Sequence, residues 1–321
     1  MIASGVRAVC AVCVLAVIGM LTGCATGEDA PPETMSAVEV PARPAEEIAR
    51  FAGDAQPLAQ VAPGVSVSET VEVDGQPRTM LIDVPSGPIP EGGYPVLFFF
   101  HGKGDNAENF RKVVAMHKTN AVVVYPQGLE SAWQGGPYAV TNDSRADETM
   151  VALTLARLGA TLPIRWGKVY AAGMSNGGGF ASLLGCRMPD VFAGTASVSA
   201  AYYHKYFAEC SDKPMATLDI HGTQDPVIQY HGGIRHGEQY DSVDRVLERA
   251  TQRNACTGPI HVDRVTQDVV RKMWTQCVAP IKHISIGGGQ HVWPRAENDP
   301  RTSVPDGYAT REIKHFFRIE G

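Results

Sequence analysis

The chain has 321 residues, of which 44% are hydrophobic, and a formal net charge of -6 at pH 7. This length and composition allow one large α/β domain or two small ones, with enough apolar side chains for a sizeable core. The acidic balance provides no basic stripe for a phosphate backbone, which argues against nucleic acid as a partner. The ten histidines are scattered singly without an HExxH pattern, so we expect neither a metal site nor a cofactor.

Residues 1–23 predict a signal peptide. Arg7 precedes an apolar stretch, residues 8–21, that is too short to span a bilayer comfortably. Residues 21–24, Leu-Thr-Gly-Cys, resemble a bacterial lipobox, whose cysteine becomes the acylated first residue of a mature lipoprotein. We therefore expect an exported cell-envelope lipoprotein held at a membrane surface only through acyl chains on Cys24. An ordinary secretory signal and an uncleaved anchor are the alternatives.

Residues 24–63 predict an extended tether, because they are rich in proline, alanine and glutamate and include Pro31, Pro32 and Pro44. Little of this segment can bury an apolar face, and its prolines stiffen the chain. The tether would hold the folded domain, residues 64–321, away from the membrane and outside the cytoplasm.

The folded domain is expected to begin with a β-hairpin and then to alternate strands and helices. Residues 64–73 alternate apolar and polar side chains, break at an Asp-Gly turn and continue in residues 78–84. Residues 95–100 form a continuous apolar run typical of a central strand. Further strands are expected at residues 121–125, 168–172, 192–199, 215–222 and 282–286. Helices are expected at residues 105–118, 144–162, 180–187, 238–254 and 306–318. Asp147 and Glu148, in the first turn of one helix, are expected to cap it.

Residues 173–177, Gly-Met-Ser-Asn-Gly, lie between an apolar strand and a helix. A serine at the tip of a sharp strand-to-helix turn needs small neighbours, because a side chain two residues away on either side would collide across the turn. Gly173 and Gly177 provide that space. The same pattern also occurs in ordinary glycine-rich turns. The strand before it and the helix after it favour a nucleophile elbow that exposes Ser175.

Such an elbow works with two backbone N–H groups that stabilise an oxyanion. One comes from the loop after a central strand, and the other from the residue after the nucleophile. Residues 101–104, His-Gly-Lys-Gly, follow the central strand 95–100. We assign the two donors to Lys103 and Asn176. A tight turn capped by polar residues is the alternative for this loop, and His101 is expected to be structural.

A carboxylate and a histidine follow two later strands. Asp225 lies just past strand 215–222, where a carboxylate would orient a catalytic histidine, and His291 lies on a glycine-rich loop after strand 282–286. The chain order Ser175, Asp225, His291 is that of α/β-hydrolases and differs from both common serine-protease orders. The competing carboxylates, which lie inside a strand or on an expected helix, are Asp219, Asp241 and Asp244.

Four aromatic side chains are assigned to substrate binding because they lie on expected loops. Trp133 lies on a long loop, and Trp293 lies two residues after His291. Tyr202 and Tyr203 belong to an aromatic cluster that would suit an apolar or aromatic acyl group. Packing on the core is the alternative for these side chains.

Four blocks of the sequence together resemble the polyhydroxybutyrate depolymerase and feruloyl esterase group, from about Gly64 to the end of the chain. The blocks are HGKGDNAENF from His101, GMSNGGG around Ser175, HGTQDPVIQY around Asp225 and GGGQHVWP around His291. The resemblance implies an α/β-hydrolase fold, in which a mostly parallel central sheet flanked by helices follows the N-terminal hairpin. It also implies a serine carboxylic-ester hydrolase.

Two positions depart from the pattern of that group. Members often have histidine directly after the glycines, whereas Gln290 precedes His291 here. Polymer-degrading members commonly carry cysteine where Lys103 stands, which weakens the case for a polymeric substrate.

Four cysteines remain once the signal peptide and an acylated Cys24 are set aside. An even number in an exported chain is typical of disulfides, although three pairings are formally possible and buried free thiols are the alternative. Sequence proximity and the resemblance favour Cys186 with Cys210 and Cys256 with Cys277. Each bridge would contribute about 3 kcal/mol on the chain-entropy model.

Together these features predict acyl-enzyme hydrolysis of short-chain, hydroxyalkanoate or feruloyl-type esters, with a small-molecule or polymeric ester as the partner. A peptidase or an envelope acyltransferase on the same scaffold is one alternative, because fold and triad do not fix the acyl acceptor. The other is a non-catalytic surface lipoprotein that binds a glycan or polymer through Trp133, Tyr202 and Trp293. The sequence leaves the oligomeric state open.

Overall fold

The computed structural model describes residues 48, 56–295, 299 and 303–321. All of them belong to one compact unit, residues 37–321. The expected signal peptide, the expected acylation site at Cys24 and most of the expected tether lie outside the described residues. Among the described residues, no helix has the length and apolar character needed to cross a membrane.

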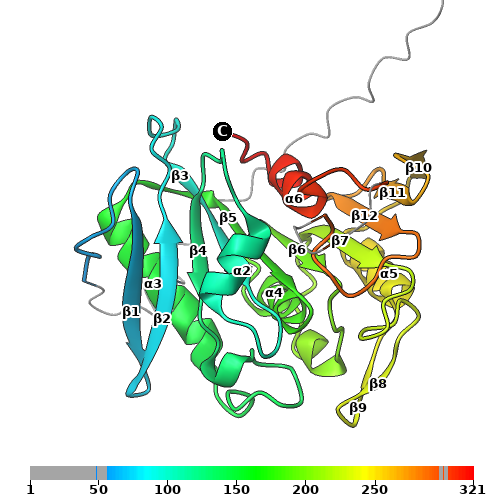
Figure 1. Ribbon diagram of the computed structural model, residues 1–321, viewed down its shortest axis with the longest axis horizontal. Helices are drawn as coiled ribbons and strands as arrows, with labels where there is room; N and C mark the ends of the chain where they lie inside the picture. Colours follow the sequence, from blue (N-terminus) through cyan, green and yellow to red (C-terminus); the bar gives the residue numbers. More distant parts are fainter. Residues whose placement is uncertain (1–47, 49–55, 296–298, 300–302) are drawn as a thin grey trace, which may run out of the picture. The chain divides into compact units, whose positions relative to one another are not determined.

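Ten strands of the described chain form one sheet in the order β1-β2-β4-β3-β5-β6-β7-β12-β11-β10. The central strands from β4 to β12 pair in parallel, whereas β1 and β2 at one edge and β10 and β11 at the other pair antiparallel (Figure 1). The strands are β1 (Ser66–Val73), β2 (Gln76–Asp83), β3 (Tyr94–Phe100), β4 (Val122–Pro126), β5 (Ile164–Met174), β6 (Gly194–Val198), β7 (Ala216–Gly222), β8 (Gly233–Arg235), β9 (Glu238–Tyr240), β10 (Ile260–Arg264), β11 (Val269–Trp274) and β12 (Ile281–Ile286). The expected hairpin and mostly parallel sheet are confirmed.

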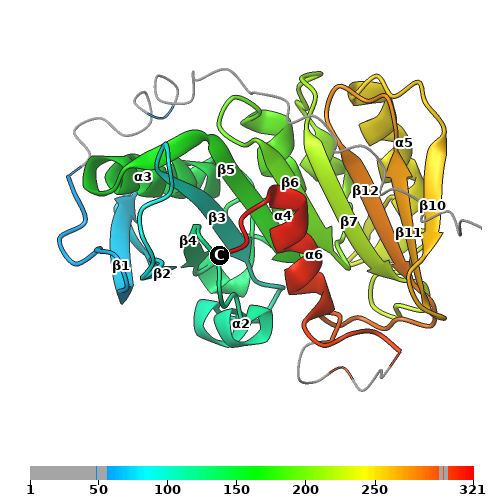
Figure 2. The same ribbon diagram turned by 90° about the horizontal axis from the view of Figure 1, so that it is seen from above.

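Helices cover both faces of this sheet. Helices α3 and α5 lie over one face, and α2 and α6 lie over the other (Figure 2). Phe180 of α4 packs in the same core cluster as α3. The helices are α2 (Ala107–Val114), α3 (Ala146–Thr161), α4 (Asn176–Arg187), α5 (Val243–Arg253) and α6 (Tyr308–Phe317), with short 3-10 helices η1 (Leu129–Ser131) and η2 (His204–Phe207).

Strand β3 shows why the central strands are uniformly apolar. Its side chains alternate between two cores: Phe98 and Phe100 pack in the cluster under α3 and α4, and Phe99 packs in the cluster under α2 and α6. All three side chains are fully buried. Because both faces of a parallel sheet are covered, a period-two polar pattern would place polar groups in a core.

The packed part of the chain begins before Gly64. Leu58 and Val61, which lie within the expected tether, are buried in the core beside α3, as is Ile48. The backbone N–H of Leu58 donates to Thr161 Oγ1 at 2.8 Å, which ties this segment to the end of α3. The C-terminal part of the tether segment is therefore packed against the domain.

The expected helix 238–254 is shorter in the structure, because a hairpin precedes it. Strands β8 and β9 pair across a turn at His236 and Gly237, both of which have positive φ. Helix α5 begins only after Ser242, whose Oγ accepts a hydrogen bond from the Arg245 N–H at 3.2 Å. Strands β10 and β11 were also not predicted.

Asp147 and Glu148 lie in the first turn of α3, as expected, but their side chains do more than favour the helix dipole. Each side chain is buried. Asp147 pairs with Arg78 of β2 at 2.5 Å and accepts a hydrogen bond from the Gln134 N–H at 2.8 Å. Glu148 pairs with Arg187 of α4 at 3.0 Å. The two carboxylates thus fasten α3 to its neighbours and to the loop after β4.

Both favoured disulfide pairings are confirmed. Cys186 bonds to Cys210, which joins the end of α4 to the segment after η2. Cys256 bonds to Cys277, which joins the chain after α5 to the turn between β11 and β12. Each pair joins consecutive cysteines of the folded domain.

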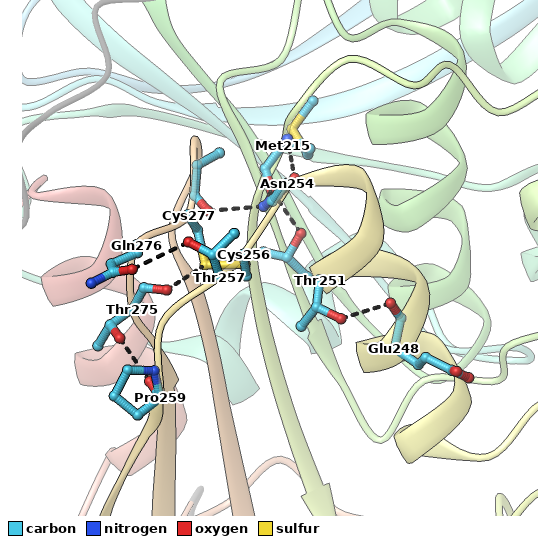
Figure 3. The surroundings of a disulfide bond; sticks show 12 residues. Met215, Glu248, Thr251, Asn254, Cys256, Thr257, Pro259, Thr275, Gln276 and Cys277 are labelled. Carbon is cyan, nitrogen blue, oxygen red and sulfur yellow. Dashed lines mark hydrogen bonds between the residues drawn. A yellow bond between two sulfur atoms is a disulfide. The ribbon is translucent and has the colours of Figure 1, made fainter.

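Figure 3 shows that Asn254 reinforces the second bridge from the end of α5. Its side-chain amide donates to Met215 O at 2.8 Å and to Ala279 O at 2.9 Å, while Oδ1 accepts from the Met215 N–H at 2.9 Å. Asn254 is fully buried. One amide therefore holds the entrances of β7 and β12 together, beside the Cys256–Cys277 bond.

Candidate active site

Ser175 lies on a strained turn between β5 and α4. Its backbone has φ 54° and ψ -119°, a conformation that costs an L-residue energy and recurs at functional sites. A Cβ added to Gly173 would lie 2.4 Å from the Gly177 backbone, and one added to Gly177 would lie 2.1 Å from Phe100 O. The two glycines are therefore required by the sharp turn, and the serine side chain stays partly exposed.

The loop after β3 approaches the serine from the side. A Cβ added to Gly102 would lie 3.6 Å from Ser175 Cβ, so the backbone at Gly102 lies beside Ser175. Asn176 is the first residue of α4, where N–H groups have no partner inside the helix and the dipole favours negative charge. Lys103 and Asn176 thus lie on the two segments that flank Ser175.

The Asn176 side chain has a structural role, because its polar atoms form hydrogen bonds within the protein. Its Oδ1 accepts from the Trp133 N–H at 2.8 Å, and its Nδ2 donates to Tyr206 OH at 2.7 Å. The side chain is fully buried. These bonds hold the start of α4 against the loop after β4, so only the backbone N–H of Asn176 remains for an oxyanion.

His291 and Asp225 meet at the carboxyl edge of the sheet. His291 Nδ1 lies 2.7 Å from Asp225 Oδ2, and the side chains are 16% and 0% exposed, respectively. Asp225 Oδ1 also accepts the N–H groups of Val227 and Ile228, both at 2.8 Å. Burial alone would raise the pKa of Asp225, but the hydrogen bond from His291 and these N–H groups hold it below the ordinary value. Asp225 is therefore an ionised acceptor that orients the imidazole.

The loops that carry the pair are tied to each other. The Thr223 N–H donates to Ile286 O at 2.9 Å, and the Gln224 N–H donates to Gly289 O at 3.0 Å. The Gly288 N–H returns a bond to Thr223 Oγ1 at 2.9 Å. These bonds continue the β7–β12 pairing beyond the strands. As a result, His291 reaches Asp225 even though Gln290 intervenes after the glycines.

The serine and the Asp225–His291 pair lie at one edge of the sheet. Ser175 follows β5, Asp225 follows β7 and His291 follows β12, and these strands run parallel. Among the described residues no hydrogen bond joins Ser175 Oγ to His291. Catalytic hydrogen bonds often tighten only once substrate is bound. The arrangement has the members of a nucleophile–base–acid relay in the expected order.

The aromatic side chains assigned to substrate binding are buried, and this part of the prediction is wrong. Trp133 is fully buried, stacks on Phe180 and donates from Nε1 to His101 O at 2.9 Å. Trp293 turns toward α6, where its Nε1 donates to Thr310 Oγ1 at 3.0 Å. In both cases the indole N–H finds an acceptor inside the protein, which favours burial over exposure.

Tyr202 and Tyr203 are also buried, at 2% exposure each. The Tyr202 hydroxyl donates to Asp219, and Tyr203 pairs through its backbone with Tyr240 of β9. Tyr203 anchors the β8–β9 hairpin to the rest of the domain.

A different cluster borders the loop after β3, residues 101–104. The Tyr138 ring lies 4.9 Å from Lys103 Nζ and 4.9 Å from the His236 ring in an edge-on contact. A Cβ added to Gly136 would lie 2.9 Å from both Asn176 Nδ2 and the Tyr138 ring, so Tyr138 adjoins the start of α4. No local pattern marks this cluster, because its members come from three loops.

Metal ligands do not gather in the described part of the chain. No group of three or more histidine, cysteine or acidic side chains there has the geometry to hold a metal ion. His101 is fully buried, and its Nε2 accepts the Gly128 N–H at 3.0 Å. His101 therefore joins the loop after β3 to the loop after β4, in agreement with a structural role.

Comparison with known proteins identifies esterases as relatives. No family model matches the chain. NocK from Nocardia uniformis, an esterase by name, is 28% identical over 226 residues, which cover 68% of this chain and 64% of NocK. Feruloyl esterase B from Piromyces equi is 25% identical over 233 residues, which cover 67% of this chain and 42% of that protein. The chain therefore spans less than two thirds of the length of either relative.

Solved structures show the fold. Esterase 2 from Thermogutta terrifontis superposes with a TM-score of 0.53 at 10% sequence identity, over 82% of this chain and 97% of that one. Together with the mostly parallel sheet flanked by helices, this likeness shows that the protein has the α/β-hydrolase fold. The expected fold class is confirmed.

Proposed function

We propose that the protein is a serine carboxylic-ester hydrolase whose nucleophile is Ser175. One observation carries the proposal: a serine on a strained elbow shares a sheet edge with an Asp225–His291 pair joined at 2.7 Å. Esterase relatives with 28% and 25% identity support the same reaction class. The fold by itself would not, because many activities share it.

In the proposed mechanism, His291 removes the proton from Ser175 Oγ as the oxygen attacks an ester carbonyl. The ionised Asp225 carboxylate holds the imidazole through Nδ1 and stabilises the imidazolium. The backbone N–H groups of Asn176 and Lys103 donate to the oxyanion. The imidazolium then protonates the leaving alcohol as the C–O bond breaks. A water molecule, activated by His291, hydrolyses the acyl-enzyme and restores Ser175.

Feruloyl-type and short-chain esters are the proposed substrates. The relatives named feruloyl esterases support an aromatic acyl group. The cluster of partly buried Tyr138 with exposed Lys103 and His236, beside the loop after β3, would contact such a group, in place of the buried Trp133 and Tyr202. Lys103 also stands where polymer-degrading proteins of the resembled group commonly have cysteine, so we favour a small ester.

The test combines turnover with covalent labelling. We expect the protein to hydrolyse p-nitrophenyl butyrate and methyl ferulate, and a fluorophosphonate to modify Ser175 in a peptide identified by mass spectrometry. Ser175→Ala should abolish both reactions, whereas Ser285→Ala, which changes a partly buried serine on β12, should preserve them. Labelling at another residue, or full turnover by Ser175→Ala, would remove Ser175 as the nucleophile.

We also propose a cellular location for the protein, at a membrane surface outside the cytoplasm. Residues 1–23 would be removed on export, Cys24 would carry the acyl chains, and the chain between Cys24 and the packed residue Leu58 would connect the anchor to the domain. Mass spectrometry of the mature N-terminus should find a lipid-modified Cys24. Cys24→Ala should release the protein from the membrane fraction. An unmodified cysteine in a membrane-bound protein would contradict the lipid anchor.

A further inference from the structure

A cavity of about 610 Å³ lies between α4, η2 and α5. We call it the Arg253 cavity, after the last residue of α5, which lines it. The Cys186–Cys210 disulfide forms part of its wall, and Phe207 and Val246 contribute apolar surface. The mechanism proposed above makes no use of this space.

The Arg253 cavity is separate from the candidate active site. Thr195 and Thr217, which line it, are paired neighbours near the beginnings of β6 and β7. Ser175, Asp225 and His291 all follow the carboxyl ends of strands in the same parallel sheet. Because the beginnings and ends of parallel strands lie at opposite edges, the cavity opens at the edge away from the serine.

Arg253 lines the cavity as a guanidinium without an acidic partner. Among the described residues no carboxylate forms an ion pair with it, and its buried Nε has no hydrogen-bond partner. Its remaining contacts are weak: one Nη lies 3.9 and 3.8 Å from the sulfurs of Cys186 and Cys210, and the other lies 3.4 Å from Thr217 Oγ1. The five N–H donors of the Arg253 guanidinium thus lie beside the cavity with few hydrogen-bond acceptors.

The missing partner has an energetic consequence. Burial lowers the pKa of Arg253 to about 10, with no acidic neighbour to offset it. The side chain remains cationic at neutral pH and carries an uncompensated desolvation cost. An anion that accepts from the guanidinium in the cavity would remove that cost.

Arg253, and not the other charged residues around the cavity, is the side chain available to bind an anion. Arg249 is already paired with Asp241 at 2.5 Å, and its guanidinium lies 5.0 Å from the centre of the Phe207 ring. Asp212 also lines the cavity but forms no ion pair with Arg253. Ser182, Thr195, Ser211 and Gln252 give the cavity a polar side, whereas Phe207, Val246 and Ala250 form an apolar wall. The cavity therefore combines one unpaired cation with an apolar wall, which fits an anion that carries a small apolar body.

We propose that the Arg253 cavity binds a small organic carboxylate, with the carboxylate on the Arg253 guanidinium and an aliphatic or aromatic body against Phe207 and Val246. An inorganic anion would leave the apolar wall unused. A neutral molecule of the same shape would leave the guanidinium unpaired. Both comparisons can be measured.

The experiment is isothermal titration calorimetry of the full chain with hexanoate and benzoate at constant ionic strength and neutral pH. We expect both to bind at least about tenfold more tightly than hexanamide, since a hydrogen bond to a charged group contributes that much. Both should also bind more tightly than inorganic phosphate, because phosphate makes no contact with Phe207 and Val246. Arg253→Met should weaken hexanoate binding by about tenfold or more. Arg245→Met is the matched control, because Arg245 lies exposed on the same helix and outside the cavity.

Two further arms keep the outcome decisive. Carboxylates are also products of ester hydrolysis, so the titration is repeated on protein labelled with fluorophosphonate; unchanged binding supports a separate site, and lost binding assigns the carboxylate to the serine site. If Arg253→Met does not fold, Ala250→Glu replaces it, since a carboxylate one turn before Arg253 should occupy the guanidinium and exclude hexanoate. Equal binding of hexanamide, tighter binding of phosphate than of hexanoate, or no binding overturns the proposal.

Discussion

Two Asp–His pairs join β7 to β12, and they differ in what surrounds them. Asp219 and His283 are direct partners in the strand register, whereas Asp225 and His291 lie on the loops that follow the same strands. Their geometry is alike, with 2.7 Å between Nδ1 and Oδ2 in each pair. The first pair is enclosed by protein on every side, and the second has an imidazole that reaches solvent.

The difference lies in the second ring nitrogen. Nε2 of His283 lies 2.7 Å from the Tyr230 hydroxyl, and the Tyr202 hydroxyl completes the network by donating to Asp219. Burial raises the pKa of both tyrosines, so they remain protonated donors. No described residue hydrogen-bonds to Nε2 of His291. Only the Asp225–His291 pair therefore leaves its outer ring nitrogen open, as the proposed role of His291 as a base requires.

The largest expected effect separates the two histidines by activity. His291→Ala should reduce kcat/KM for p-nitrophenyl butyrate by about 10⁴-fold, because it removes the general base. His283→Ala should change the activity per folded molecule by less than about tenfold. Initial rates, corrected for the folded fraction by circular dichroism, make the comparison. A similar loss in both variants would show that the buried pair also takes part in the reaction.

The free energy of unfolding should decrease more in His283→Ala than in His291→Ala, the reverse of the order expected for activity. His283→Ala leaves Asp219 buried without one of its two side-chain partners, which costs about 3 kcal/mol. His291→Ala leaves Asp225 with two backbone N–H bonds and a partly exposed space, so we expect a loss of about 1 kcal/mol or less. Urea unfolding at neutral pH measures both. Equal losses would contradict the division into an enclosed and an open pair.

A third histidine sharpens the comparison because backbone groups, rather than a carboxylate, hold it. Burial lowers the pKa of His101 below its ordinary value of 6.5, and a hydrogen bond to Gly102 O only partly offsets this. The unfolded chain therefore binds this proton first as the pH falls. The free energy of unfolding should decrease below pH 6.5 and stop decreasing once the pH is below the folded pKa.

Urea unfolding at pH 7.5, 6.5 and 5.5 checks this dependence. His101→Gln should reduce the decrease between pH 7.5 and 5.5, whereas His117→Gln, which alters an exposed histidine, should not. The same decrease in all three proteins would assign the acid sensitivity to other groups.

The smallest expected effect concerns the proposed oxyanion donors, because these donors are backbone N–H groups and not side chains. Lys103→Met preserves the N–H of residue 103 and removes only the ammonium above the Tyr138 ring. We expect kcat to change by less than about threefold, with a modest rise in KM, since an exposed cation–π contact contributes about 0.5–1 kcal/mol. Steady-state kinetics with methyl ferulate measures both constants. A hundredfold loss of kcat would place the ammonium itself in the reaction.

Local patterns were sufficient for the serine turn and for the central strands. Gly173 and Gly177 reveal the elbow because the collision that they avoid lies within five residues of sequence. The central strands are recognisable because a sheet covered on both faces requires uninterrupted apolar runs. Asp225 and His291 could be placed because each follows such a run.

Features that depend on distant partners could not be predicted. Trp133 and Trp293 look like loop residues, and only the acceptors His101 O and Thr310 Oγ1 explain their burial. Asp147 in a first helical turn suits a dipole, yet its partner Arg78 is 69 residues away in sequence. Strand β10 has largely exposed side chains at a sheet edge, so it lacks the apolar alternation that marks a strand.

The connectivity of the disulfides bears on how the protein is made. Cys186 is followed in the chain by its own partner Cys210, and Cys256 by Cys277, so neither bond encloses or crosses the other. A chain that emerges from its N-terminal end exposes each partner before any cysteine of the next pair. Correct oxidation then needs an oxidant but no later reshuffling. We expect the protein to mature in cells that lack a disulfide isomerase.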